Sequence, residues 1–200
     1  MPVSTVTSPS FPLDERGNLV VQDGTLDRDA QVHFEGRHNR LVVDGTVAPA
    51  HLDIHFLGDD AQVVIGALEA DTELNLDITV GAGASVEIGA GVSTGTGCTL
   101  TVAPGAQVRI GAGTHLGPHV SVEAEDPHGF TGQQDVTVGS HVWVMGETSL
   151  RGGTAIGDGA VLQMVPLVDH EVEAGQLVRG LPAIPVRPVT WDRADLATED

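Results

Sequence analysis

An aspartate and a histidine two positions apart, Asp126 and His128, are the residues of this sequence best suited to chemistry. They stand in the polar segment EAEDPHGFTGQQD, residues 123–135. An imidazole gains and loses a proton near neutral pH and can therefore act as a general base. The D-x-H pair makes this segment a candidate catalytic loop, with His128 as the candidate base.

Eight other histidines compete with His128 for a functional role. Single histidines are common on protein surfaces without any function, but imidazole is also a common ligand of zinc. One alternative is therefore a metal site built from His115, His119, His128 and His141. The remaining histidines are His33, His38, His51, His55 and His170.

The elements that must position this loop are predicted by a six-residue repeat on both sides of it. Aliphatic residues recur at every sixth position, and in the second series small or β-branched residues follow four positions later. A period of six fits neither an α-helix nor a simply alternating strand. It fits a coil of short strands joined by tight corners, with the aliphatic residue inside and the small residue at the corner. The aliphatic series are Ile110, Leu116 and Val122, then Val138, Val144, Leu150, Ile156, Leu162 and Val168; the small series is Val142, Thr148, Thr154, Ala160 and Pro166.

A longer repeat runs through the first half of the chain. The phrases AQVVIGA, ASVEIGA and AQVRIGA place Ile65, Ile88 and Ile110 at nearly equal spacings, and Val43 of LVVDG precedes Ile65 by almost the same interval. Self-similarity at such a period is typical of a stacked-coil protein. The rhythm breaks at residues 123–135, which are therefore predicted to be ejected from the coil, and ejected loops often carry function.

The charge and cysteine content exclude several classes of protein. The net charge is −19, and all nine basic residues are arginines. Nucleic acid and anionic membranes are not expected as partners, because both bind cationic surfaces. Cys98 is the only cysteine, so no intrachain disulfide is expected, and its surroundings suggest a small core residue. The sequence shows no signal-peptide pattern and no membrane-spanning run, which favours a cytoplasmic protein.

The composition predicts three parts. Residues 1–18 are rich in proline, serine and threonine and are expected to form an extended arm. Residues 19–188 are expected to form one all-β solenoid, whose Pro-rich end caps the last coil. Residues 189–200 are expected to form a C-terminal tail.

The sequence resembles the hexapeptide-repeat acyltransferases over residues 38–188. The family motifs I-x-I-G, H/N-V-W-I-G and L-K-G-V-x-I-G-x-x-x-V are similar to VTVGSHVWVMGETSLRGGTAIGDGAV, residues 136–161. Its closing motif I-V-x-G-N-P-A-K-x-I-R is similar to VEAGQLVRGLPAIPVR. EDPHGF and NRLVVDG resemble motifs of the subgroup that O-acetylates capsular, exopolysaccharide and O-antigen sugars. The resemblance implies a left-handed parallel β-helix, assembled as a homotrimer, that transfers acetyl from acetyl-CoA to a saccharide hydroxyl without a metal ion.

The resemblance also implies roles for individual residues. His128 matches the catalytic histidine, which takes a proton from the sugar hydroxyl, and Asp126 matches the acidic residue that holds the imidazole tautomer. The other matching residues are expected beside acetyl-CoA or the sugar: an aromatic ring that packs on the ligand, two arginines that meet phosphates, and two glycines of the motif. These are Trp143, Arg151, Arg187, Gly146 and Gly153.

Four departures from the family pattern keep alternatives open. Met145, Gln163 and Val165 replace small residues, and Ile184 replaces a lysine expected at a phosphate. Bulk at these places favours the alternative of a non-catalytic β-helix scaffold or pseudoenzyme. A second alternative is a metalloenzyme similar to the γ-type carbonic anhydrases, a related β-helix family that binds metal with three histidines between subunits.

Overall fold

The computed structural model of the protein describes residues 4–5, 13–23, 30–45, 50–68, 72–126, 132–163, 165–180 and 184–192. These residues form short strands and turns, and none of them is helical. No helix in these ranges is therefore long and apolar enough to cross a membrane.

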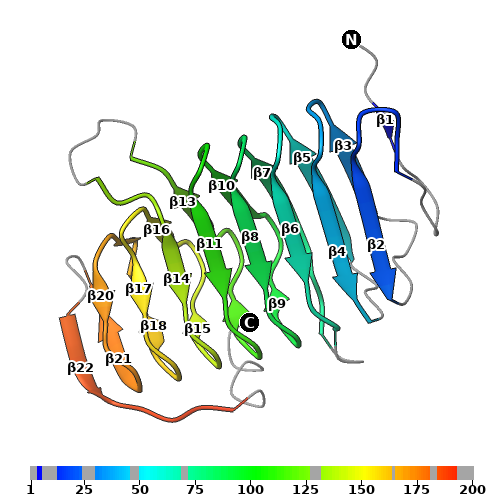
Figure 1. The fold of residues 1–200 in the computed structure, drawn as a ribbon. Coiled ribbons are helices and arrows are strands. Elements are labelled where there is room, and N and C mark those ends of the chain that lie inside the picture. The colour runs from blue at the N-terminus through cyan, green and yellow to red at the C-terminus, as the bar shows by residue number, and fades with distance from the viewer. Residues whose placement is uncertain are drawn as a thin grey trace.

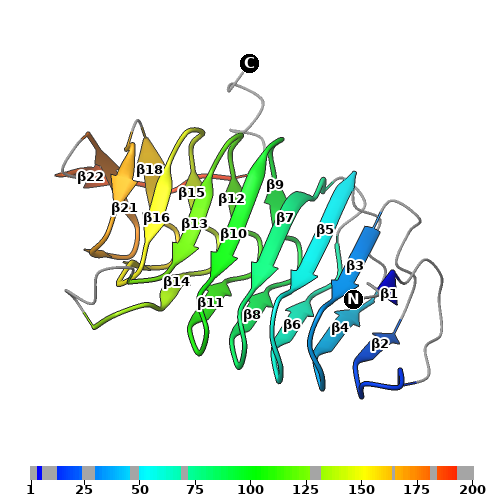
Figure 2. The ribbon, with the colours of Figure 1, turned by 90° about the horizontal axis from the view of Figure 1, so that it is seen from above.

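The strands lie in three sheets that run along a solenoid (Figures 1 and 2). The first sheet contains, in spatial order, β1 (Ser4–Thr5), β3 (Ala30–Phe34), β5 (His51–Phe56), β7 (Asn75–Val80), β10 (Cys98–Val102), β13 (Ser121–Ala124), β16 (Ser149–Arg151) and β19 (Leu167–Val168). The second contains β2 (Leu19–Asp23), β4 (Arg40–Asp44), β6 (Gln62–Ile65), β8 (Ser85–Ile88), β11 (Gln107–Ile110), β14 (Val136–Val138), β17 (Ala155–Ile156) and β20 (Glu171–Val172). The third contains β22 (Ile184–Pro188), β21 (Gln176–Arg179), β18 (Val161–Gln163), β15 (Trp143–Val144), β12 (His115–Leu116) and β9 (Ser93–Thr94).

Successive coils pair in parallel, and only the terminal strands β1 and β22 of the described chain pair antiparallel. A complete coil passes through the second, third and first sheets in turn, as β8, β9 and β10 do. The predicted fold class, an all-β left-handed parallel β-helix, is confirmed.

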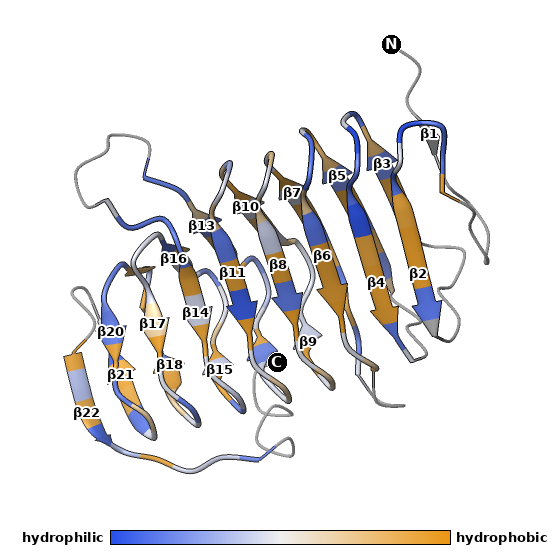
Figure 3. Cartoon of the chain, in the orientation of Figure 1, coloured by the Kyte–Doolittle hydropathy of each residue, from blue (hydrophilic) through white to orange (hydrophobic). Residues whose placement is uncertain are grey.

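The predicted repeat positions stack as columns inside the solenoid. Val43, Ile65, Ile88 and Ile110 are neighbours in register across β4, β6, β8 and β11. All four are almost fully buried. Figure 3 shows the alternation of hydrophobic and hydrophilic residues that results along the strands. Because strand side chains alternate between faces, each inward column leaves an outward polar column beside it.

The six-residue repeat also holds in the structure, with one shift. Its aliphatic members from Val138 to Val168 are all buried. At the last small position, Pro166 is exposed and Val165, one residue earlier, fills the core. Strand β13 extends through Ala124. Glu123 and Ala124, the first two residues of the segment predicted to be ejected, therefore belong to this strand.

The corners need glycine where one coil lies directly on the next. A Cβ on Gly111 would lie 2.4 Å from the carbonyl carbon of Gly139 in the following coil. Real Cβ contacts are not this short, so any side chain at residue 111 would push the two coils apart.

Cys98 is part of the core, as its sequence context suggested. It is 1% exposed, and its Sγ donates a hydrogen bond to the carbonyl of Gly117 at 3.1 Å. Burial raises the pKa of the Cys98 thiol. Since the thiolate is the reactive form, we expect Cys98 to resist thiol reagents at neutral pH until the protein unfolds. Thiol titration before and after adding denaturant measures this, and rapid labelling of the folded protein would contradict it.

Candidate active site

The segment that contains the D-x-H pair leaves the solenoid at the corner between the first and second sheets, between β13 and β14 (Figure 1). Its two ends converge on Gly152 in the next coil. A Cβ on Gly152 would lie 2.5 Å from the carbonyl oxygen of Glu125 and 2.8 Å from that of Gln133. Only glycine leaves room for both ends of the segment at this place.

Asp126 ties the two ends of this segment together. Its Oδ2 accepts a hydrogen bond from the backbone N–H of Gly132 at 2.8 Å. His128 lies between these two residues in the sequence, but outside the described residues. The carboxylate therefore closes the chain segment that carries the candidate base.

Arg151 lies on the first sheet beside this segment, and it is already paired. Its guanidinium forms a 2.8 Å ion pair with Oε2 of Glu123, its register partner on β13. The other oxygen, Oε1, accepts hydrogen bonds from the hydroxyls of Ser121 and Ser149 at 3.3 and 3.4 Å. Glu123 thus orients Arg151, and at the same time it offsets the positive charge that a phosphate would meet.

An open hollow of about 490 Å³ lies next to the base of the segment. It is bounded on one side by residues 132–135 and on the other by Gly153 and its neighbours. The lining includes the side-chain amides of two glutamines and the hydroxyls of two threonines, which suit the polar groups of a sugar or of pantetheine. The full lining is Gly132, Gln133, Gln134, Asp135, Thr137, Gly153, Thr154 and Ala155.

Trp143 lies on a different face, pointing outward from the third sheet. It is 6% exposed, because Trp191 from the C-terminal segment covers it together with Val161 and Leu177. The two indole centroids are 5.5 Å apart, with the rings tilted by 46°. The chain itself therefore occupies the face of Trp143 that was expected to meet a ligand.

His141 holds Trp191 in this position. The imidazole stacks on the indole with centroids 4.3 Å apart and ring planes 8° apart. The indole Nε1–H donates to the backbone carbonyl of His141 at 2.9 Å, and Nε2 of His141 donates to the carbonyl of Trp191 at 2.7 Å. Spacing could not have predicted this contact, because the two residues are 50 positions apart.

The last two predicted contact residues lie away from the ejected segment. Gly146 is at the corner between the third and first sheets, where a Cβ would lie 2.8 Å from the carbonyl oxygen of Pro118. Arg187 is exposed on β22, the last strand of the third sheet, opposite Leu177. The structure therefore brings Asp126, Arg151 and Gly153 to one corner, and it places the other described candidates elsewhere.

The four departures from the family pattern have different surroundings. Val165 packs inside the solenoid and takes no space on the surface. Met145 packs against the cluster around Trp143. Gln163 accepts a hydrogen bond from Arg179 through its side chain, and Ile184 is exposed. Only Met145 adds bulk next to a predicted contact residue.

Three residues of the predicted alternative metal site, His115, His119 and His141, are among the described residues. Two of them form hydrogen bonds with other groups. Nδ1 of His115 is hydrogen-bonded to Ser93 at 2.9 Å, and His141 is bonded to Trp191. In the part of the chain that the structure describes, the group able to hold a metal ion is a different one, His33, Asp53 and His55. A signal for this group exists in the sequence: His33 and His55 are one coil period apart, and Asp53 shares their outward face.

The structure is similar to two solved acetyltransferase structures. The polySia-specific acetyltransferase NeuO matches with 26% identity and a TM-score of 0.78, over 91% of this chain and 88% of that chain. The polysialic acid O-acetyltransferase OatWY matches with 16% identity and a TM-score of 0.66, over 88% of this chain and 92% of that chain. No family model and no curated protein matches the sequence. The resemblance of this chain to the hexapeptide-repeat acyltransferases, with their left-handed β-helix fold, is confirmed.

Proposed function

We propose that this protein is an O-acetyltransferase that moves an acetyl group from acetyl-CoA to a hydroxyl of a saccharide, with His128 as general base. The observation that carries this proposal is the likeness to NeuO, which extends over 91% of the chain at 26% identity. The D-x-H pair in the one segment ejected from the six-residue rhythm supports it independently.

The proposed chemistry needs one base and no covalent enzyme intermediate. The imidazole of His128 takes the proton of the acceptor hydroxyl while that oxygen attacks the thioester carbonyl carbon. The carbon–sulfur bond then breaks, and the leaving thiolate of CoA receives the proton from the imidazolium. Asp126 acts by closing the segment that carries His128, through its bond to Gly132.

The distribution of the candidate residues favours a site shared between copies of the chain. Asp126, Arg151 and the hollow beside Gly153 lie at one corner, whereas Gly146 and Arg187 lie elsewhere on the solenoid. In a homotrimer, one copy would contribute the corner with the ejected segment and its neighbour would contribute the other surface. The trimer, like acetyl-CoA as donor, is part of this proposal.

The acceptor we propose is neutral or only locally charged. NeuO and OatWY are described as acting on polysialic acid, which is a polyanion. This chain carries a net charge of −19, which would repel a long polyanion, although salt screens such repulsion beyond about 10 Å at 0.1 M ionic strength. A panel of neutral and sialylated saccharides, assayed for acetylation by mass spectrometry, separates the two classes of acceptor.

Binding of acetyl-CoA tests the proposal most directly. We expect saturable binding by calorimetry, with a dissociation constant between about 1 μM and 1 mM, as is typical of enzyme substrates. Since a ligand of the folded state shifts the unfolding equilibrium, acetyl-CoA at about 100 times that constant should stabilise the protein by about 2.7 kcal/mol.

Free CoA is the comparison ligand for this titration, since it shares the phosphates and pantetheine but lacks the acetyl group. An absence of heat and of any rise in melting temperature at millimolar acetyl-CoA would overturn acyl transfer. The non-catalytic scaffold would then be the better assignment, and the cover that Trp191 places over Trp143 would agree with it.

A further inference from the structure

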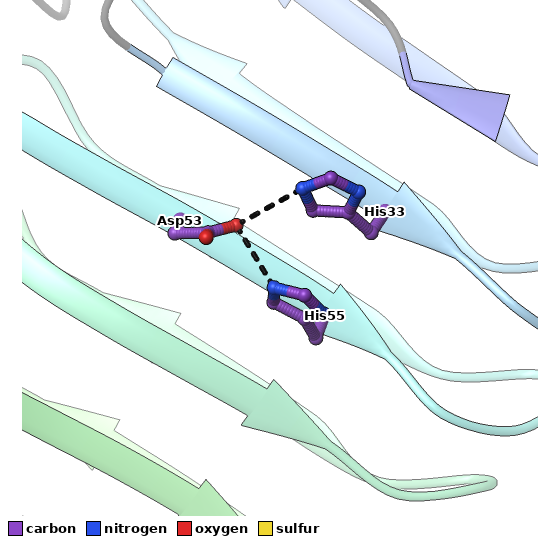
Figure 4. Close-up of side chains that lie close together, drawn as sticks. All are labelled: His33, Asp53 and His55. Atoms are coloured by element: carbon purple, nitrogen blue, oxygen red, sulfur yellow. Dashed lines mark ion pairs between the residues drawn. The ribbon is translucent and has the colours of Figure 1, made fainter. Parts of the chain in front are cut away.

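Two histidines and an aspartate lie together on the outer face of the first sheet, several strands along the solenoid from the ejected segment. His33 on β3 is the register partner of His55 on β5, and Asp53 precedes His55 by two positions on the same face. Figure 4 shows the carboxylate of Asp53 facing both imidazole rings. Three strand spacings, about 14 Å, separate β5 from β13 at the base of the ejected segment.

The geometry of this group differs from that of an ordinary hydrogen-bonded pair. Nε2 of His33 lies 3.5 Å and Nε2 of His55 lies 3.1 Å from the same oxygen, Oδ1 of Asp53. This oxygen is buried, yet it has no hydrogen-bond partner among the described residues. The two imidazole rings stack on each other with centroids 4.4 Å apart. A buried carboxylate oxygen without a hydrogen bond is costly unless a cation satisfies it.

The same three atoms match the requirements of a divalent transition metal ion. One ligand atom from each residue lies within 4.8 Å of the other two. Zinc binds imidazole nitrogen and carboxylate oxygen at about 2.0–2.2 Å, so tetrahedral ligands lie about 3.3 Å apart. The observed N–O separations of 3.1 and 3.5 Å bracket that value. Small rotations of the half-buried side chains would bring all three atoms into one coordination sphere.

The surrounding charge also favours a cation. Asp77 is the register partner of Asp53 on β7, and it adds a second carboxylate to the same face. Asp77 is paired with His51 at 2.8 Å. His51 therefore engages Asp77, whereas His33 and His55 both turn toward Asp53.

We propose that His33, Asp53 and His55 bind one divalent transition metal ion, for which Zn²⁺ is the best-suited species. The sequence led us to expect no metal, and its alternative metal site involved other histidines. Three protein ligands leave a fourth position of a tetrahedral ion to solvent. Because the ligands come from two coils, the ion would cross-link β3 and β5 near the N-terminal end, where β1 is the only described strand beyond β3 in this sheet. This inference is independent of the proposed acetyl transfer.

Calorimetric titration of Zn²⁺ into the full chain, without a polyhistidine tag and after chelator treatment, tests the proposal. We expect saturable binding of a single ion and a higher melting temperature when the ion is present. Replacing Zn²⁺ with Co²⁺ should produce the visible absorption of a low-symmetry nitrogen and oxygen site. Loss of a residue that hydrogen-bonds to a metal ligand lowers metal affinity by about 10–100-fold. Loss of a ligand itself should cost at least as much, so we expect His33→Ala and His55→Ala each to weaken Zn²⁺ binding by about 100-fold or more.

His51→Ala is the matched control, because His51 is an exposed histidine of the same strand that pairs with Asp77 instead. It should bind Zn²⁺ as the unmodified chain does. Asp53→Asn keeps the shape of the side chain and should weaken binding without changing the metal-free melting temperature much, which guards against misfolded variants. The proposal is overturned if the unmodified chain shows no saturable binding. It is equally overturned if Zn²⁺ binds unchanged to both His33→Ala and His55→Ala, since other histidines would then hold it.

Discussion

The variant His128→Ala is expected to transfer acetyl groups about 10²–10⁴-fold more slowly than the unmodified protein, the usual contribution of a general base. The imidazole is the proposed acceptor of the hydroxyl proton, and alanine cannot take its place. The constant to measure is kcat with a saccharide acceptor identified in the panel above. Binding of acetyl-CoA should persist, because the base acts on the acceptor hydroxyl and not on the donor.

His170→Ala is the matched control for this prediction. His170 is another histidine of the second half of the chain, and its ring contacts Asp169 at 3.1 Å. Its loss should leave kcat unchanged. Equal rates for His128→Ala and the unmodified protein would show that His128 is not the base, while acetyl-CoA binding would still report separately on the donor site.

The variant Trp191→Ala is expected to lower the free energy of unfolding by about 3 kcal/mol, near the lower end of the range for a buried tryptophan. Trp191 is 8% exposed, and alanine removes its contact with Trp143, its stack on His141 and the hydrogen bond of its indole N–H. Urea unfolding measures the change. The chain contains two tryptophans and no tyrosine, so fluorescence reports on this cluster alone. The remaining emission, from Trp143, should shift to the red as its ring becomes exposed to water.

Trp191→Phe is the control for the Trp191 variant. It keeps a ring on His141 and on Trp143 but loses the indole N–H bond, so its cost should be clearly smaller than that of alanine. If Trp191→Ala unfolded at the same urea concentration as the unmodified protein, the C-terminal segment would not be held on the third sheet in solution. Trp143 would then be accessible to a ligand, as the sequence alone had suggested.

The solenoid could be predicted from the sequence because its core is periodic. The column through Val43, Ile65, Ile88 and Ile110 follows from one repeated position, since each coil buries its aliphatic residue against the same position of the next. The break in that rhythm falls between β13 and β14. Part of the candidate site followed from it, because Asp126 belongs to that segment and Gly153 lies beside its base.

The outward faces could be predicted only in part. The coil period predicts that His33 lies beside His55. The neighbours of the other outward residues depend on the register between successive coils, and the coils differ in length. The family motifs indicated Trp143 and Arg151 as contact residues. They did not show that another residue covers Trp143 or that a carboxylate pairs with Arg151.

The sequence by itself therefore determined the coil, the inward columns and the place where the chain leaves them. The tertiary structure alone decided that Trp191 covers Trp143, that Glu123 holds Arg151, and that Asp53 faces two imidazoles. The physical reason is the range of the interactions. Inward packing repeats in every coil, so the local sequence pattern predicts it. Surface contacts join residues that come close only after the coils have stacked and the C-terminal segment has turned back along them.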